Sequence, residues 1–129
     1  MKKVIRDKFR KMERRLSEEY GPFNFFGVFL PEESPNRWDL LVSANWLASD
    51  DGAATRFLIE RMREHLDQGE IIFMSTVVVL EGDHPDMDEI YEEIEVEHGF
   101  VEMRDEVIFG RDIERAYILT CRRSTAEAW

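Results

Sequence analysis

The spacing of apolar residues changes twice between residues 38 and 80, and this change constrains the fold more than any other feature of the chain. From Trp38 to Ala44 every second residue is apolar, as expected for a strand with one buried face. A stripe at helical spacing follows, formed by Ala54, Phe57, Leu58, Met62 and Leu66. Residues 71–80 are apolar on both faces, which is typical of a central strand. A strand–helix–strand unit forms a right-handed crossover, so the two strands are predicted to be parallel.

The patterns on either side of this unit complete the prediction of the fold. The first helix is indicated by an apolar stripe formed by Ile5, Phe9, Met12, Leu16 and Tyr20. Residues 23–30 are apolar on both sides, and the short turn after them predicts an antiparallel hairpin with residues 38–44. Beyond residue 80 we expect a short helix from Pro85, an exposed strand or extended loop over residues 96–109, and a last strand over residues 116–122.

These elements predict an α+β fold in which a mixed sheet of about five strands packs against two to three helices. We expect a single domain over residues 1–123 and a loose tail over residues 124–129. In the last strand Tyr117, Leu119 and Cys121 alternate and should share one face. Cys121 is therefore interpreted as a core thiol rather than a nucleophile.

The composition restricts the compartment and the classes of partner. The net charge of −11 opposes binding of nucleic acid over the whole surface, because the phosphates would be repelled. The one cysteine cannot form an internal disulfide, and the N-terminus lacks the apolar stretch of a secretory signal. The apolar run at residues 71–80 is too short to cross a bilayer. We therefore expect a cytoplasmic protein that does not act at a membrane.

Charge is strongly segregated along the chain. Residues 1–15 contain eight basic and two acidic side chains, whereas residues 81–106 contain twelve acidic side chains and one basic. Three interpretations remain open. Both segments are solvated, or the basic helix lies on the acidic segment within the chain or across a dimer, or the basic helix binds an anionic partner such as nucleic acid. The side chains proposed for partner binding are Lys3, Arg6, Arg10, Arg14, Asp86, Glu89 and Glu93.

The sequence contains no recognisable motif for a cofactor or a metal. The seven glycines are isolated, so neither common phosphate-binding loop is present, and the three histidines show no HxH or HExxH spacing. An acidic cluster consists of Asp83, His84, Asp86, Asp88 and Glu89. We interpret it as the start of a helix, where carboxylates are favoured, with a divalent-cation site as the alternative. We predict no cofactor and no metal.

Polar residues at the end of one predicted strand are the best candidates for a small-molecule site. Asp39, Ser43 and Asn45 lie near the start of the second helix, where ligands often bind in α/β units. His65 on that helix is a further candidate for acid–base chemistry. In the structural alternative, Asp39 pairs with Arg37 or with an arginine of the first helix, and the other polar groups hydrogen-bond where the strand leaves the sheet.

Two neighbouring segments carry a distinctive motif: Phe26-Gly27-Val28-Phe29-Leu30, and residues 37–47 with the sequence RWDLLVSANWL. They resemble a small family of uncharacterised prokaryotic proteins, in which a W-D-L-x-V-S-A-x-W-L run follows an F-G-hydrophobic-F-L strand at the same distance. The likeness is specific over residues 23–47 and more loosely traceable as far as residue 122. The resemblance implies a family without an assigned activity, so it transfers no catalytic residue.

Together these patterns predict a protein without enzymatic activity. We expect a protein-interaction or regulatory module that uses its charge-segregated surfaces, forms a homo-oligomer and offers acidic surface to a basic protein partner. The first alternative is a small-ligand or metal-dependent enzyme with a site near Asp39, Ser43 and Asn45. The second is a weak nucleic-acid binder that uses the basic N-terminal helix.

Overall fold

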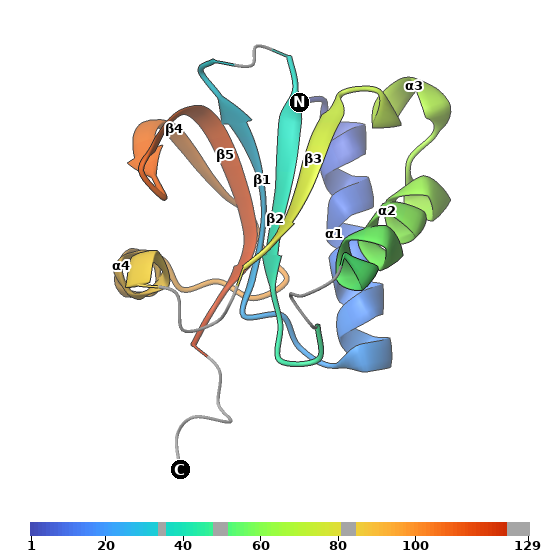
Figure 1. Cartoon of the computed structure of the whole chain (residues 1–129), viewed down its shortest axis with the longest axis horizontal. Helices are drawn as coiled ribbons and strands as arrows, with labels where there is room; N and C mark the ends of the chain where they lie inside the picture. Colours follow the sequence, from blue (N-terminus) through green and yellow to red (C-terminus); the bar gives the residue numbers. More distant parts are fainter. Residues whose placement is uncertain (34–35, 48–51, 81–84, 124–129) are drawn as a thin grey trace.

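The computed structural model describes residues 1–33, 36–47, 52–80 and 85–123. In chain order its elements are α1 (Lys3–Tyr20), β1 (Phe25–Pro31), β2 (Trp38–Ser43), α2 (Ala53–His65), α3 (Gln68–Ile71), β3 (Met74–Val79), α4 (Pro85–Glu93), β4 (Val101–Ile108) and β5 (Arg111–Cys121). The strands form one mixed sheet in the order β3-β2-β1-β5-β4 (Figure 1). The predicted α+β fold is confirmed, whereas the predicted tail at residues 124–129 lies outside the described residues.

Strand pairing confirms two predictions made from residue spacing. β1 and β2 form an antiparallel hairpin in which Phe25 lies opposite Ser43. β2 and β3 are parallel and are connected through α2, as the strand–helix–strand pattern predicts. A second hairpin, formed by β4 and β5, joins the sheet through antiparallel pairing of β5 with β1.

Two apolar cores lie on opposite faces of the sheet. α1 and α2 cover one face, and α4 lies on the other (Figure 1). Phe9 of α1 and Leu58 of α2, both on predicted apolar stripes, are buried in one cluster with Leu40 of β2. Met87 of α4 is buried in the second cluster with Phe25 of β1. Helical spacing therefore explains the α1–α2 layer, because each stripe turns its apolar side to the sheet.

β3 differs from its prediction in position and in length. The apolar run at residues 71–80 predicts a central strand, but β3 lies at the edge of the sheet, and its Ser75 and Thr76 are exposed. The strand begins only at Met74, because Asp67 and Glu70 form a capping box that starts the short helix α3. The prediction of a central strand was wrong because an apolar run shows that both faces are covered, not that both edges are paired.

β5 begins at Arg111 rather than at residue 116, and near its other end it carries a β-bulge. The register with β1 skips Leu119, and this extra residue reverses the alternation of side chains. Tyr117 and Leu119 therefore belong to the core on the α1 side, whereas Cys121 belongs to the core on the α4 side. The prediction that these three side chains share a face was wrong, although Cys121 is buried as expected.

Candidate functional site

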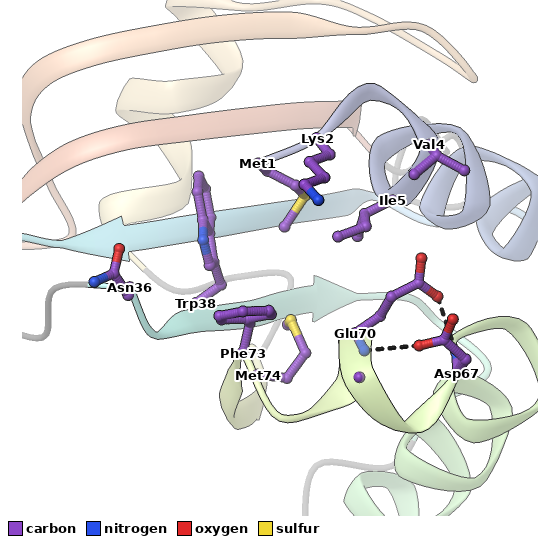
Figure 2. Close-up of a pocket in the computed structure, with 11 residues that line it drawn as sticks. Met1, Lys2, Val4, Ile5, Asn36, Trp38, Asp67, Glu70, Phe73 and Met74 are labelled. Atoms are coloured by element: carbon purple, nitrogen blue, oxygen red, sulfur yellow. Dashed lines mark hydrogen bonds between the residues drawn. The ribbon is translucent and has the colours of Figure 1, made fainter.

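A cavity of about 700 Å³ opens where the N-terminal end of α1 meets the start of β2 and the turn between α3 and β3 (Figure 2). Its walls are mostly apolar, with Ile5 from α1, Trp38 from β2, Phe73 from the turn and Met74 from the start of β3. A concave, mainly apolar site of this size is the usual form of a binding site. The cavity is therefore the first candidate for a functional surface.

Apolar side chains extend from the cavity onto the surface beside it. Val4 and Phe73 line the cavity and remain 54% and 46% exposed. Ile72, next to Phe73 in the chain, is 62% exposed. Single exposed apolar residues are common on proteins, whereas a group of them beside a cavity marks an interaction surface. We refer to Val4, Ile72 and Phe73 as the apolar rim.

Two carboxylates, one from α3 and one from its N-cap residue, contribute to the polar part of the cavity wall. Asp67 and Glu70 are joined by the hydrogen bonds of the capping box (Figure 2). Lys8 Nζ lies 2.6 Å from Glu70 Oε1, and this hydrogen bond lowers the pKa of Glu70 below its ordinary value. Because Lys8 offsets the charge of Glu70, the exposed Asp67 is the carboxylate that a partner would meet first.

A second polar cluster is buried beneath α1. Glu13 is fully buried, and its Oε1 lies 2.5 Å from Nδ1 of His98. Its Oε2 accepts hydrogen bonds from Thr120 Oγ1 (3.0 Å) and from Ser17 Oγ (2.9 Å). The backbone N–H of His98 donates to Thr120 Oγ1 at 3.1 Å. We call Glu13, Ser17, His98 and Thr120 the Glu13 network.

Three separate segments meet in the Glu13 network. Ser17 follows Glu13 by one helical turn, so the spacing of α1 alone brings these two side chains together. Thr120 reaches α1 because the bulge at Leu119 reverses the alternation of β5. His98 lies in the segment before β4 with a φ of 54°, a left-handed conformation that costs energy for any residue with a side chain.

The hydrogen-bond directions in the Glu13 network indicate a structural role. Both hydroxyls donate to the Glu13 carboxylate, so neither is hydrogen-bonded to His98 in the way that a base activates a nucleophile. Each oxygen of the Glu13 side chain has a hydrogen-bond partner, as a buried polar group requires. The network thus ties α1 to β5 and to the segment that precedes β4.

Glu13 is absent from the residues predicted for a site, although its position in the sequence carries a signal. Positions 9, 13 and 16 are neighbours on one face of a helix, so Glu13 interrupts the apolar stripe of α1. A carboxylate on a buried face must find hydrogen-bond donors. Its place on the stripe therefore indicates a buried polar cluster, while the donors His98 and Thr120 emerge only from the tertiary structure.

The polar residues predicted at the strand end do not meet in one place. Asp39 and Ser43 are buried, and they lie four steps apart along the strand, a distance of about 13 Å. Asn45 is exposed after β2, where its Oδ1 accepts a hydrogen bond from Asn24 Nδ2 at 3.1 Å. His65 belongs to α2, and burial is the main cause that lowers its pKa.

Asp39 forms an ion pair with a residue that sequence analysis did not consider. Its Oδ2 lies 3.3 Å from Nη1 of Arg111 at the start of β5, whereas the expected partners were Arg37 or an arginine of α1. Arg111 also contacts Glu33 Oε1 at 2.6 Å. Burial raises the pKa of Asp39 above its ordinary value, and the charge of Arg111 opposes this shift only in part.

The two charged helices lie on opposite faces of the sheet (Figure 1). The predicted partner-binding residues on α1 are Lys3, Arg6, Arg10 and Arg14, and those on α4 are Asp86, Glu89 and Glu93. Because the sheet separates these helices, the basic helix does not lie on the acidic helix within one chain. Part of the acidic segment, residues 81–106, does reach α1. The guanidinium of Arg6 on α1 lies 5.0 Å from the ring centre of Phe100 in that segment. A contact between these helices across a dimer remains a prediction.

Two kinds of site are not found in the part of the chain that the structure describes. Its His, Cys, Asp and Glu side chains form no group of three or more that could hold a metal ion. Asp83 and His84 of the predicted acidic cluster lie outside the described residues. Within the same part of the chain, no helix combines the length and the apolar character that crossing a membrane requires.

Comparison with known proteins does not assign the chain to a family. No protein-family model, no curated protein and no solved structure matches it. The resemblance of residues 23–47 to an uncharacterised family therefore stays a prediction.

Proposed function

We propose that the protein is a non-enzymatic interaction module that binds a segment of a partner protein at the cavity beside α1. The apolar rim is the observation that supports this proposal, because Val4, Ile72 and Phe73 stay exposed next to a concave apolar site. Binding energy in protein interfaces is concentrated in a few apolar or aromatic anchors that fill such pockets. One anchoring side chain of the partner would occupy the cavity, and the rim would cover the flanking residues.

The charge of the chain favours a basic partner. The net charge is −11, and the cavity wall contains the exposed carboxylate of Asp67 as well as Lys2, so the attraction for a basic partner comes mainly from the charge of the whole chain. Lys or Arg residues beside the anchor would be attracted to this surface, which accelerates association and disfavours acidic competitors. We therefore propose that the bound segment carries a large apolar side chain next to Lys or Arg.

The buried polar groups support an interaction role rather than catalysis. A catalytic site that uses a nucleophilic side chain needs a base in contact with that nucleophile, beside a cavity that admits substrate. Glu13 is instead held by partners within the fold, and Asp39 is held by Arg111. Both carboxylates are thus engaged in holding segments of the fold together.

Selection from a phage-displayed library of random peptides tests the proposal. Peptides enriched on the wild-type protein are expected to carry an aromatic or leucine residue beside Lys or Arg. Phe73→Ser and Val4→Ser should each weaken binding of these peptides at least about tenfold, or ~1.4 kcal/mol. Both side chains are half-exposed, so circular dichroism should show an unchanged fold.

Val107→Ser provides the matched control. Val107 is 68% exposed on β4, at the other edge of the sheet, and its replacement should leave peptide binding unchanged. Equal affinities for the rim variants and the control would contradict the proposal. Enrichment of acidic peptides would contradict the proposed chemistry of the partner.

A further inference from the structure

One edge of the sheet has unpaired backbone groups within the described part of the chain. β3 lies at this edge and pairs only with β2 there. The N–H of Leu80 donates to Val42 O at 2.7 Å. Because backbone groups along a strand point alternately to its two sides, the N–H and C=O groups of Val77 and Val79 point away from β2.

The opposite edge of the sheet is protected, whereas β3 is regular from Thr76 to Val79 and is interrupted only before this stretch, by a register shift at Ser75. β4 carries Glu102, Arg104, Asp105 and Glu106, and Asp105 has a φ of 53° that interrupts the regular strand. Charges and backbone irregularities are the means by which proteins prevent edge strands from pairing with other chains. Residues 74–80, with the sequence MSTVVVL, contain no charged side chain. Among the residues that the structure describes, no strand other than β2 pairs with β3, so this edge can accept another strand.

We propose that a second copy of this chain pairs with β3 in an antiparallel arrangement, with the two-fold axis at Val78. Val77 of one copy then lies opposite Val79 of the other, and these residues carry the outward-pointing backbone groups. The two reciprocal pairs of N–H and C=O groups are satisfied by one another. The result is a continuous sheet that runs through both copies.

The composition of β3 favours a second copy over other partners. In an isologous contact the same surface of each copy meets itself. A charged side chain near the two-fold axis would then lie against an identical charge, so the contact requires an uncharged segment. Cross-strand pairs of valine stabilise antiparallel strands, and Val78 would face Val78 of the other copy. The run at residues 71–80 has the composition of a central strand, and this pairing makes it one.

The surface beside β3 supplies further apolar contact. A specific interface buries about 1,000 Å² or more in total, and pairing of two short strands alone provides only part of it. A groove of about 240 Å³ runs between α2 and β3 and is lined by Ile59, Met62, Met74 and Val77 among others. The proposed interface therefore extends from the strand into this groove.

The mass of the protein in solution, measured by light scattering after size-exclusion chromatography, tests the proposal. The wild-type protein is expected at twice the chain mass of 15.3 kDa. Thr76→Lys should return it to the monomer mass, because the exposed residue 76 would lie opposite Leu80 of the other copy. Val79→Pro should do the same, because it removes an outward N–H without breaking a bond to β2. The matched control is Val107→Lys on β4, which should remain dimeric.

Salt separates this interface from one formed by the charged helices. Each copy has a net charge of −11, so two copies repel each other, and raising the salt from about 0.1 M to 1 M should preserve or strengthen the dimer. Loss of the dimer at high salt would overturn the proposal in favour of a contact between basic and acidic surfaces. The proposal would also be overturned if the wild-type protein were monomeric at every concentration, or if the Thr76→Lys variant remained dimeric. These outcomes do not depend on peptide binding at the cavity, so the two proposals can fail separately.

Discussion

Glu13 Oε1 lies 2.5 Å from His98 Nδ1, although 85 positions separate the two residues in the chain. The glutamate is fully buried, whereas the histidine side chain is 35% exposed. This contact joins the first helix to the segment that leads into β4, and Thr120 extends it to β5. A buried carboxylate is stable only while its donors are in place, so the fold depends on this contact.

His98→Ala should lower the free energy of unfolding by about 1–3 kcal/mol, because it leaves the buried Oε1 atom of Glu13 without its hydrogen-bond partner. Urea unfolding monitored by circular dichroism measures the loss. His65→Ala, a histidine substitution on α2, is the control and should cost less than about 1 kcal/mol. If both variants are equally stable, the hydroxyls of Ser17 and Thr120 suffice to hold Glu13.

Asp39→Asn should become more stable relative to the wild type as the pH rises. The pKa of Asp39 is raised in the folded protein, mainly by burial. The favourable contribution of Asp39 to the free energy of unfolding is therefore present below the pKa that this carboxyl group has in the unfolded chain. The contribution is lost as the pH rises through the pKa of Asp39 in the folded protein. Asparagine cannot ionise and does not lose this contribution.

Urea unfolding of both proteins at several values between about pH 4 and pH 7 measures this difference. The gain of Asp39→Asn over the wild type should grow across this interval. A difference that is constant or that falls with pH would show that the contact with Arg111 outweighs the effect of burial.

Cys121 should resist thiol reagents in the folded protein. Burial raises its pKa to about 12, so at pH 8 only about one molecule in 10⁴ carries the reactive thiolate, even before access is considered. Ellman's reagent should label the thiol completely in urea and negligibly within the same time in buffer. Rapid labelling of the native protein would reveal frequent opening of the core on the α4 side.

Gly27→Ala should destabilise the protein by about 1–3 kcal/mol, because an added methyl group must displace packed rings. A Cβ atom at position 27 would lie 2.8 Å from Cε1 of Phe29 and 3.1 Å from Cε1 of Phe25, and both rings are buried. Thermal unfolding measures the loss. Gly69→Ala is the control, since its Cβ would meet only Asp67 Oδ1 at 3.5 Å. An unchanged melting temperature for Gly27→Ala would mean that this core adjusts without cost.

Local patterns were sufficient to predict most elements of the fold. The stripes of α1 and α2, the β1–β2 hairpin and the parallel pairing of β2 with β3 all follow from residue spacing. These features depend on residues close together in the chain, and the periods of helix and strand translate directly into which side chains are buried. None of the predicted strand-end residues identified the cavity, because its walls come from α1, β2 and the segment before β3.

The amino-acid sequence by itself determined the type and order of the main elements and the apolar faces that they bury. Only the tertiary structure decided that β3 lies at an edge, that Arg111 pairs with Asp39, and that His98 reaches Glu13. The physical reason is that these relationships join segments far apart in the chain. Their energy depends on the order of the strands in the sheet and on the positions of its bulges. The local spacing of residues encodes neither of these.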